Sequence, residues 1–250
     1  DGGCSVEPVY EIASPLFEKI VIDLGERYGR GKSFTIEAKN TISDNTEIEQ
    51  LNQRSIYSTP LYTEFLDNKF NIMDTPGADD FIGGVISSFK VSDAGILVVN
   101  AQQGVEVGTE IFVRYAEEHK KPLVVAINQL DAEKASYENT VETLKQSFGK
   151  KIALIQFPVA TGAGFDSFVD VLRMKLYTFK DENGTRVESE IPENLMDQTN
   201  ELRSALVEVA AESTEELMEK YFAEGELCFE DMIKGLHIGF LKGLIMPTFC

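Results

Sequence analysis

The chain has 250 residues, of which 43% are hydrophobic and 10% aromatic, so it can bury a sizeable core without disulfides or metals. Its 23 basic and 42 acidic residues give a net charge of −19 at pH 7, which repels phosphate backbones and argues against simple groove binding to DNA or RNA. No apolar run approaches the roughly 18 residues of a membrane span, so we expect a soluble, cytoplasmic protein.

The first forty residues have the pattern of β-structure. Phe17–Leu24 is rich in branched residues, Ser33–Glu37 alternates, and a glycine-rich loop lies between them. Residues 1–39 are therefore expected to form a β-hairpin. From Asn40 to Arg54 the chain is polar and has no periodicity, which predicts a loop.

Strands and helices then alternate along the chain. The predicted strands are Tyr57–Leu66, Lys69–Asp74, Gly95–Asn100, Pro122–Asn128 and Lys151–Gln156. The predicted helices are Asp80–Lys90, Val105–Glu118, Tyr137–Phe148 and Gly164–Met174. Alternation of this kind, with strongly apolar strands, is typical of an α/β fold in which helices cover both faces of a mostly parallel sheet.

Beyond Tyr177 the chain is predicted to be mainly helical and is strongly acidic. Apolar residues recur at helical spacing over Glu193–Phe222 and Phe229–Leu244. Residues 181–235 contain 16 acidic and 4 basic residues, a net charge of −12. Two interpretations stay open: a solvated helical surface, or a docking face for a basic partner.

The most specific motif follows the strand predicted at Lys69–Asp74. There the apolar sequence ends in Asp74-Thr75-Pro76-Gly77. In P-loop GTPases the aspartate of an Asp-x-x-Gly motif holds Mg²⁺ through water, and the glycine amide contacts the γ-phosphate. A single motif of this length is weak evidence, since any strand-to-turn junction can produce one.

A second motif ends the strand predicted at Pro122–Asn128. The sequence Asn128-Gln129-Leu130-Asp131 matches the guanine-reading motif Asn-Lys-x-Asp, with glutamine in place of lysine. A carboxylate here accepts hydrogen bonds from the ring N–H and the amine of guanine, two donors that adenine lacks. The alternative is a strand end with an Asx turn. Two such motifs, each at the carboxyl end of a strand and separated by one strand–helix unit, favour a nucleotide site.

On these motifs, residues 38–250 resemble the G domain of translation elongation factor G and its bacterial elongation-factor-G-like relatives. Met73–Phe81, Ala101–Glu106 and Gln156–Phe165 extend the likeness. The resemblance implies GTP or GDP as ligand, Mg²⁺ held indirectly by Asp74, and the ribosome as partner. The implied nucleotide-binding residues are Asp74, Thr75, Pro76, Gly77, Asn128, Gln129 and Asp131. The acidic helices stand where this family has its G′ subdomain, which faces the ribosomal stalk protein.

The chain departs from this family at its start. A G domain should open with a strand, a Gly-x-x-x-x-Gly-Lys-Ser/Thr loop and a helix. The loop Gly25–Ser33 ends in Gly-Lys-Ser, but its first glycine is one residue early and a strand pattern follows. Residues 9–37 instead resemble a β-hairpin from the C-terminal region of bacterial α-mannosidases. The predicted fold is therefore an incomplete P-loop-type GTPase domain.

Three segments are expected. Residues 1–39 form the hairpin segment, and residues 40–176 form a G-domain core that lacks the P-loop unit. Residues 177–250 form a mainly helical, G′-like acidic insertion and the start of the return to the core.

Departures near the first motif bear on hydrolysis. Ala78 stands where the family usually has a histidine that positions water, so no catalytic residue is assigned. The Mg²⁺-binding threonine of the family corresponds to Ser55, or to Thr59 after a shift of register. Asp79 and Asp80 are expected to cap the helix that follows.

Two functions stay open. The chain is a translational GTPase domain impaired by the loss of its P-loop, or a nucleotide-dead module that docks a basic ribosomal partner through its acidic insertion. A third interpretation, a fragment of a carbohydrate-active enzyme, lacks assignable paired carboxylates in residues 1–40.

Overall fold

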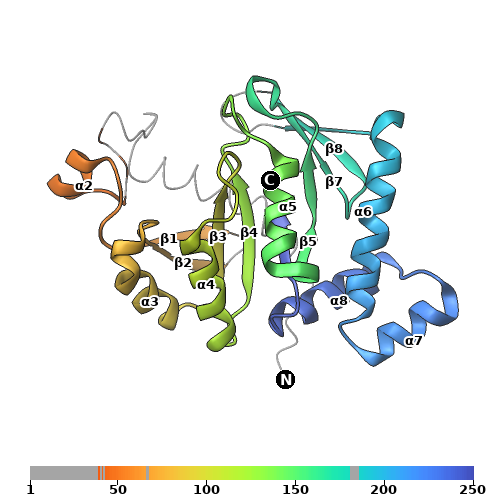
Figure 1. Ribbon diagram of the computed structural model, residues 1–250. Helices are drawn as coiled ribbons and strands as arrows, with labels where there is room; N and C mark the ends of the chain where they lie inside the picture. The colour runs from red at the N-terminus through yellow and green to blue at the C-terminus, as the bar shows by residue number, and fades with distance from the viewer. Residues whose placement is uncertain (1–38, 40, 42, 66–67, 181–185) are drawn as a thin grey trace. The chain divides into compact units, whose positions relative to one another are not determined.

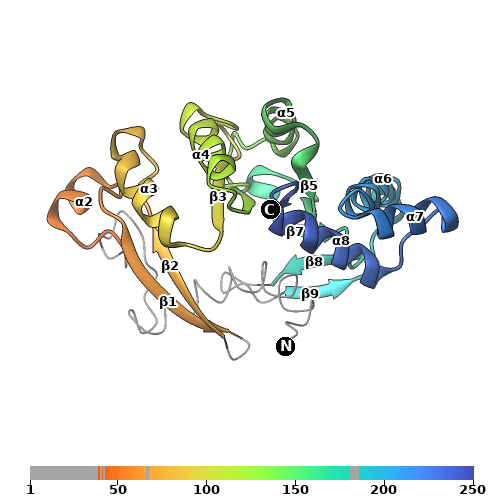
Figure 2. The ribbon, with the colours of Figure 1, turned by 90° about the horizontal axis from the view of Figure 1, so that it is seen from below.

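The computed structural model describes residues 39, 41, 43–65, 68–180 and 186–250. These residues fall into two compact units, one ending at Asp93 and one running from Ala94 to Cys250. Figures 1 and 2 show the elements of each unit. The hairpin predicted over residues 1–39, apart from Lys39, and the loop Gly25–Ser33 lie outside the described residues.

The first unit is built around an antiparallel hairpin of β1 (Thr59–Phe65) and β2 (Asn68–Asp74). Its register places Thr59 opposite Asp74. After β2 the chain forms a short 3₁₀ helix, η1 (Asp79–Phe81), and then α3 (Ile82–Val91). Both strands and the helix agree with the predicted positions to within a few residues.

The expected capping by Asp79 and Asp80 is wrong. Both aspartates lie inside the 3₁₀ helix rather than before it. The N-cap residue of α3 is Phe81, which makes no side-chain cap hydrogen bond. The acidic side chains still lie at the positive end of the helix dipole, where negative charge is favourable.

The loop predicted from Asn40 to Arg54 contains a helix, α2 (Glu47–Asn52). Thr46 and Glu49 form a capping box, in which each side chain accepts a hydrogen bond from the backbone N–H of the other residue. A helix of six residues is too short to show apolar periodicity, so its signal is local and is carried by the cap.

Glu49 holds this segment together from a buried position, with a residue exposure of 1%. Its Oε1 accepts the backbone N–H groups of Ile56 and Tyr57 at 3.1 and 3.0 Å. Its Oε2 accepts the N–H of Thr46 at 3.2 Å and its hydroxyl at 2.6 Å. Burial acts to raise the pKa of Glu49, but these hydrogen bonds outweigh it, so the pKa lies below its ordinary value of 4.5.

Replacement of this carboxylate is expected to destabilise the first unit. Glu49→Gln should cost about 2 kcal/mol, because hydrogen bonds to a charged acceptor are replaced by weaker ones. Since the folded-state pKa is depressed, the contribution is complete above about pH 4.5 and is lost as the pH falls through the folded-state value. Amide hydrogen exchange of Ile56 and Tyr57 measures the effect.

The matched control is Glu47→Gln, because Glu47 is exposed in the first turn of the same helix. This control should leave exchange of both amides unchanged. In acid the exchange rates of Glu49→Gln and the parent should converge. If the difference between them stays the same as the pH falls, the stabilisation does not depend on the ionised form of Glu49.

The core of the second unit is a parallel sheet in the order β3-β4-β10-β5. Its strands are β3 (Gly95–Asn100), β4 (Leu123–Asn128), β5 (Ile152–Leu154) and β10 (Met246–Phe249). The accompanying helices are α4 (Val107–Glu118) and α5 (Tyr137–Phe148), and η2 (Gly149–Lys151) leads into β5. Val125, Leu144 and Ile245 lie at the centre with at most 1% exposure. The α/β prediction is confirmed.

A second, antiparallel sheet follows β5. Its strands are β6 (Gln156–Pro158), β7 (Ser167–Asp170), β8 (Lys175–Phe179) and β9 (Arg186–Ser189). The helix predicted at Gly164–Met174 is therefore wrong, since β7 and a turn occupy it after η3 (Gly162–Gly164). A short apolar run such as 168–172 does not distinguish a buried strand from a buried helix.

The last part of the chain is helical as predicted. It forms α6 (Glu193–Ala211), α7 (Glu215–Glu224) and α8 (Phe229–Leu241), and β10 then joins the core sheet. The helices α6 and α8 cross closely at Gly235, where a Cβ atom would lie 2.4 Å from the carbonyl oxygen of Ala210. Among the described helices, none has the length and apolar character needed to cross a membrane.

Candidate nucleotide-binding site

The first motif lies at the carboxyl end of β2. Asp74 is the last residue of the strand and is half-buried, as is Thr75, while Pro76 is buried and Gly77 is exposed. A Cβ atom on Gly77 would meet no atom within 4 Å. There is therefore open space beside the Cα atom of Gly77, where a ligand can approach the backbone closely.

The two candidate hydroxyl groups lie at different places relative to Asp74. Thr59 is directly opposite Asp74 in the hairpin, and directly opposed side chains share a face with Cβ atoms about 5 Å apart. Its hydroxyl donates to the carbonyl oxygen of Ser43 at 3.0 Å. Ser55 lies before the strand, and its hydroxyl donates to Oδ1 of Asp44 at 2.7 Å. Thr59 is therefore the hydroxyl that accompanies Asp74.

Asp74 and Thr59 together could supply only some of the ligands of a Mg²⁺ ion. Carboxylate and hydroxyl oxygens are ligands that Mg²⁺ accepts, and in nucleotide sites the ion takes its other ligands from water and phosphate. Within the described part of the chain, no three His, Cys, Asp or Glu side chains are grouped to hold a metal. Asp74 and Thr59 thus fit a nucleotide-associated Mg²⁺ and not a metal caged by protein alone.

The second motif lies at the carboxyl end of β4. Leu130 is 3% exposed and anchors the loop in the core, whereas Asn128, Gln129 and Asp131 are exposed. Gln129 has a φ of 60°, a left-handed conformation that costs a non-glycine residue about 1 kcal/mol. This turn directs the polar side chains outward while the apolar one stays buried.

Two contacts that sequence reasoning missed support the second motif. Asn100 ends β3 beside Asn128, and its Nδ2 donates to Oε1 of Gln129 at 2.8 Å. The backbone N–H of Gly162 donates to the carbonyl oxygen of Leu130 at 2.7 Å. The polar residue that ends β3 was a usable sequence signal, because parallel strand ends meet at one sheet edge.

The segment Ala160–Gly164 precedes the helix that was predicted at Gly164–Met174, and in the structure it leads into a strand instead. It joins β6 to β7 through the 3₁₀ helix η3. Gly162 has a φ of +73°, which glycine adopts without strain. This conformation allows the loop to lie against the 128–131 turn.

The carboxyl ends of three core strands form one edge of the sheet. Asn100 is opposite Asn128, and Phe249 of β10 is opposite Ala126. Ligands of open parallel sheets bind outside this edge, where loops leave the strands. The Asn128–Asp131 motif lies in the second unit and the Asp74–Gly77 motif in the first.

A helix-flanked parallel sheet with these strand-end motifs defines a G domain of the P-loop GTPase type. The chain belongs to the elongation factor Tu GTP-binding domain family, whose model matches residues 14–229. The predicted resemblance to elongation factor G is thereby confirmed at the level of the family.

Two relatives support this assignment. An elongation factor G-like protein of Thermotoga maritima is 36% identical over 206 residues, which are 82% of this chain and 29% of that protein. A crystal structure of a protein from Thermus thermophilus matches with a TM-score of 0.83 and 26% identity, covering 93% of this chain and 35% of that one. The chain thus spans about a third of the length of these relatives.

The family match begins at residue 14 and so includes much of the segment for which a mannosidase hairpin was predicted. That second resemblance stays a prediction, as do the segment boundaries at residues 39 and 176.

Proposed function

We propose that this chain is the guanine-nucleotide-binding part of a translational GTPase that acts on the ribosome and uses Mg²⁺. The observation that carries the proposal is the turn after β4, where buried Leu130 anchors a loop that exposes Asn128 and Asp131. This arrangement offers a carboxylate and an amide to the edge of a base. Membership of the translation-factor family supplies the class of reaction.

Each site residue has a role in this proposal. Asp131 accepts from the two guanine donors, and Asn128 bonds the base edge. The stem of Gln129, fixed by Asn100, lies beside the base. Asp74 holds Mg²⁺ through water with Thr59 beside it, and the N–H of Gly77 donates to the terminal phosphate. When bound, Mg²⁺ would neutralise developing charge on the phosphates.

Hydrolysis is expected to be slow in this chain. Ala78 follows Gly77 and presents only a methyl group, which neither donates nor accepts a hydrogen bond. A residue that orients the attacking water is a recurring part of GTPase sites. The side chain at this position cannot supply that function.

The base-reading role of Asp131 is tested by comparing GDP with ADP. NMR titration of the parent chain should show GDP binding that is tighter than ADP binding by roughly 100-fold or more, because Asp131 accepts two hydrogen bonds from guanine and each hydrogen bond to a charged group contributes about 1.5–3 kcal/mol. Asp131→Ala should remove this preference, because it should lower the affinity for GDP and leave the affinity for ADP unchanged. The control is Glu133→Ala, an exposed acidic residue two positions away. Equal affinity of the parent for GDP and ADP would overturn the assignment.

A second candidate function rests on the acidic insertion. Residues 181–235 carry a net charge of −12, and Phe222 of α7 is 79% exposed among glutamates. Charge of one sign along a contiguous segment favours association with a partner of the opposite charge. This surface would dock a basic partner, such as the ribosomal stalk protein, whether or not nucleotide binds.

Docking through the insertion should be sensitive to salt. Charge reversal of three exposed glutamates on α7, in Glu215→Lys/Glu216→Lys/Glu219→Lys, is expected to weaken stalk-protein binding by about tenfold or more. Raising the ionic strength should weaken binding of the parent in the same direction. The control reverses exposed glutamates of α4, in Glu110→Lys/Glu118→Lys. Binding that survives both high salt and the α7 reversal would exclude this candidate.

A further inference from the structure

Two pairs of lysines lie at the amino edge of the core sheet, where the chain enters β4 and β5. Lys120 and Lys121 follow α4 and lead into β4, and Lys150 and Lys151 lie in η2 and lead into β5. Residues 119–121 and 149–151 contain these four lysines and no acidic residue, in a chain whose net charge is −19. This edge is therefore a local exception to the charge of the molecule.

The two lysine pairs belong to one surface. Nζ of Lys151 lies 2.5 Å from Oε1 of Glu117 in the last turn of α4, so the end of η2 reaches the end of α4. Lys120 and Lys150 are both exposed. Glu117 and its neighbour Glu118 lower the positive charge of the surface, but four lysines against two glutamates leave a surplus of two positive charges.

An exposed leucine lies at the same edge. Leu244 is 52% exposed and precedes β10, the strand that pairs with β4 on one side and with β5 on the other. Met246 is opposite Ile152, so two residues earlier Leu244 is level with Lys150. Adjacent strands are about 4.8 Å apart, which brings the leucine between the two lysine pairs. The four lysines and Leu244 together form a surface that we call the lysine edge.

The position of Leu244 is fixed by the way in which α8 ends. Gly243 has a φ of 67°, and its N–H donates to the carbonyl oxygen of Phe240 at 2.9 Å. The N–H of Leu244 donates to the carbonyl oxygen of Gly239 at 2.8 Å. These bonds form a Schellman motif, in which a side chain at the place of Leu244 often packs on one at the place of Gly239. Glycine offers no side chain there, so the leucine is held in a defined position with its apolar surface exposed.

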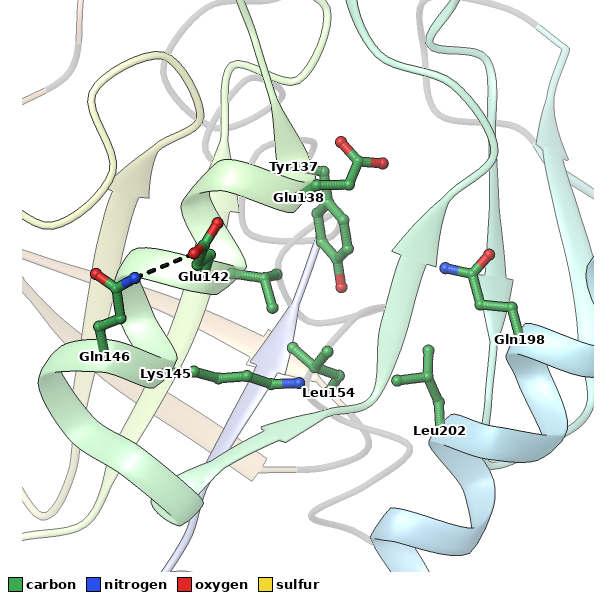
Figure 3. Close-up of a pocket in the computed structure, with 9 residues that line it drawn as sticks. Tyr137, Glu138, Glu142, Lys145, Gln146, Leu154, Gln198 and Leu202 are labelled. Atoms are coloured by element: carbon green, nitrogen blue, oxygen red, sulfur yellow. Dashed lines mark hydrogen bonds between the residues drawn. The ribbon is translucent and has the colours of Figure 1, made fainter.

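The lysine edge is separate from the other features of the second unit. The Asn128–Asp131 motif follows the carboxyl end of β4, whereas the lysine edge precedes the amino ends of β4 and β5. A cavity of about 490 Å³ lies between α5 and α6, and Figure 3 shows Glu138, Glu142 and Lys145 around it. None of the residues of the lysine edge lines that cavity.

The chemistry of the lysine edge favours a short acidic segment over a larger polyanion. A nucleic acid or an anionic membrane extends beyond the edge and meets the repulsion of a chain with a net charge of −19. A short segment senses mainly the local surplus, because charges beyond about 8 Å are largely screened at physiological salt. A phosphate backbone would also leave Leu244 uncovered, whereas a protein segment can supply an apolar side chain.

We propose that the lysine edge docks a short acidic segment of a partner protein. An apolar side chain of that segment covers Leu244, and aspartate or glutamate residues on either side of it contact the lysine pairs. The proposal does not depend on nucleotide binding. It also differs from docking through the acidic insertion, because it requires a partner of the opposite charge.

The test uses the full chain and a rhodamine-labelled peptide in which one phenylalanine stands between runs of glutamate and aspartate. Anisotropy at physiological salt should show saturable binding. Replacement of the phenylalanine of the peptide by serine should weaken binding about fivefold or more, because Leu244 then has no apolar partner. Absence of saturable binding, or equal binding of the two peptides, would overturn the proposal.

Removal of lysine charges locates the binding. Lys120→Gln/Lys150→Gln should weaken binding of the phenylalanine peptide about fivefold or more, because one charge is lost from each pair. The matched control is Lys134→Gln/Lys145→Gln, which changes the net charge equally at exposed positions outside the lysine edge. Equal losses in the two double variants would contradict docking at this edge.

Removal of the leucine tests the apolar contact. Leu244→Ser should weaken binding of the phenylalanine peptide about fivefold and leave the serine peptide within about twofold, because only the first peptide has an apolar contact to lose. Val107→Ser is the matched control, since Val107 is 67% exposed in the first turn of α4. The same loss for both peptides in Leu244→Ser would contradict a contact between the leucine and the phenylalanine.

Two other classes of partner are tested with the same variants. Poly(U) and vesicles of phosphatidylserine should both bind the chain more weakly than the phenylalanine peptide does. Tighter binding of either one, which is lost in Lys120→Gln/Lys150→Gln, would overturn the proposal and assign the lysine edge to a nucleic acid or to a membrane.

Discussion

Gly235→Ala is expected to destabilise the second unit by about 3 kcal/mol, although alanine favours a helix over glycine by about 1 kcal/mol. The added Cβ atom would lie 2.4 Å from the carbonyl oxygen of Ala210 and 2.9 Å from its carbonyl carbon and Cβ. These are backbone and near-backbone atoms of a residue with 0% exposure, so relief requires α6 and α8 to separate. A thermal melt should show Tm lowered by about 6–12 °C for a chain of this size.

The matched control lies one turn further along α8. At Gly239 an added Cβ atom would lie 2.4 and 2.5 Å from Cδ1 and Cγ1 of Ile245, a buried side chain that has to shift to admit it. Gly239→Ala should cost less than Gly235→Ala, about 1–2 kcal/mol, because the clash is with side-chain atoms rather than with a carbonyl group and the helix propensity of alanine offsets part of the strain. Equal melting temperatures for the two variants would contradict the importance of the close α6–α8 crossing.

The core strands and their ends could be predicted from the sequence because the signal is local. The runs at Gly95–Asn100 and Leu123–Asn128 are apolar and stop at a polar residue, and the structure begins and ends these strands within one residue of the prediction. The helix Tyr137–Phe148 was predicted with the correct bounds, since its apolar spacing is regular.

Two errors in the predicted secondary structure, at α2 and at Gly164–Met174, have different physical causes. The helix α2 is specified by the capping box of Thr46 and Glu49 and by the donors of Ile56 and Tyr57, none of which is a periodic pattern. The run 168–172 became a strand because β6 and β8 pair with it on either side. Those pairing partners are set by the tertiary fold and not by the run itself.

The candidate site was predictable only in part for the same reason. Asp74 and the Asn128–Asp131 turn could be located because each follows an apolar strand directly. The choice of Thr59 over Ser55 needs the β1–β2 register, and the support from Asn100 and Gly162 needs contacts between segments about 30 residues apart. A single sequence does not carry that pairing information.

The largest expected effect concerns nucleotide affinity. The 250-residue chain is expected to bind GTP only in the millimolar range and to hydrolyse it near the uncatalysed rate. A phosphate loop supplies several N–H groups, a lysine and a hydroxyl to the nucleotide, and each hydrogen bond to a charged group contributes roughly 1.5–3 kcal/mol. Without a complete Gly-x-x-x-x-Gly-Lys-Ser motif, about four such bonds are lost, or about 6–12 kcal/mol before water recovers a part. Since each 1.4 kcal/mol or so is tenfold, a nanomolar site becomes roughly millimolar.

Calorimetric titration of GTP and GDP with Mg²⁺, followed by a phosphate-release assay, measures this loss. Weak binding that Lys32→Ala leaves unchanged would agree with a missing phosphate loop. Lys39→Ala is the control, because it removes the same charge outside the Gly25–Ser33 loop. Micromolar binding that disappears in Lys32→Ala and survives in Lys39→Ala would instead mean that Gly29–Ser33 serves as the phosphate loop. In that case hydrolysis would still be slow. GTPase sites use a side chain to position the attacking water, and Ala78 stands where the family usually has a histidine for this role.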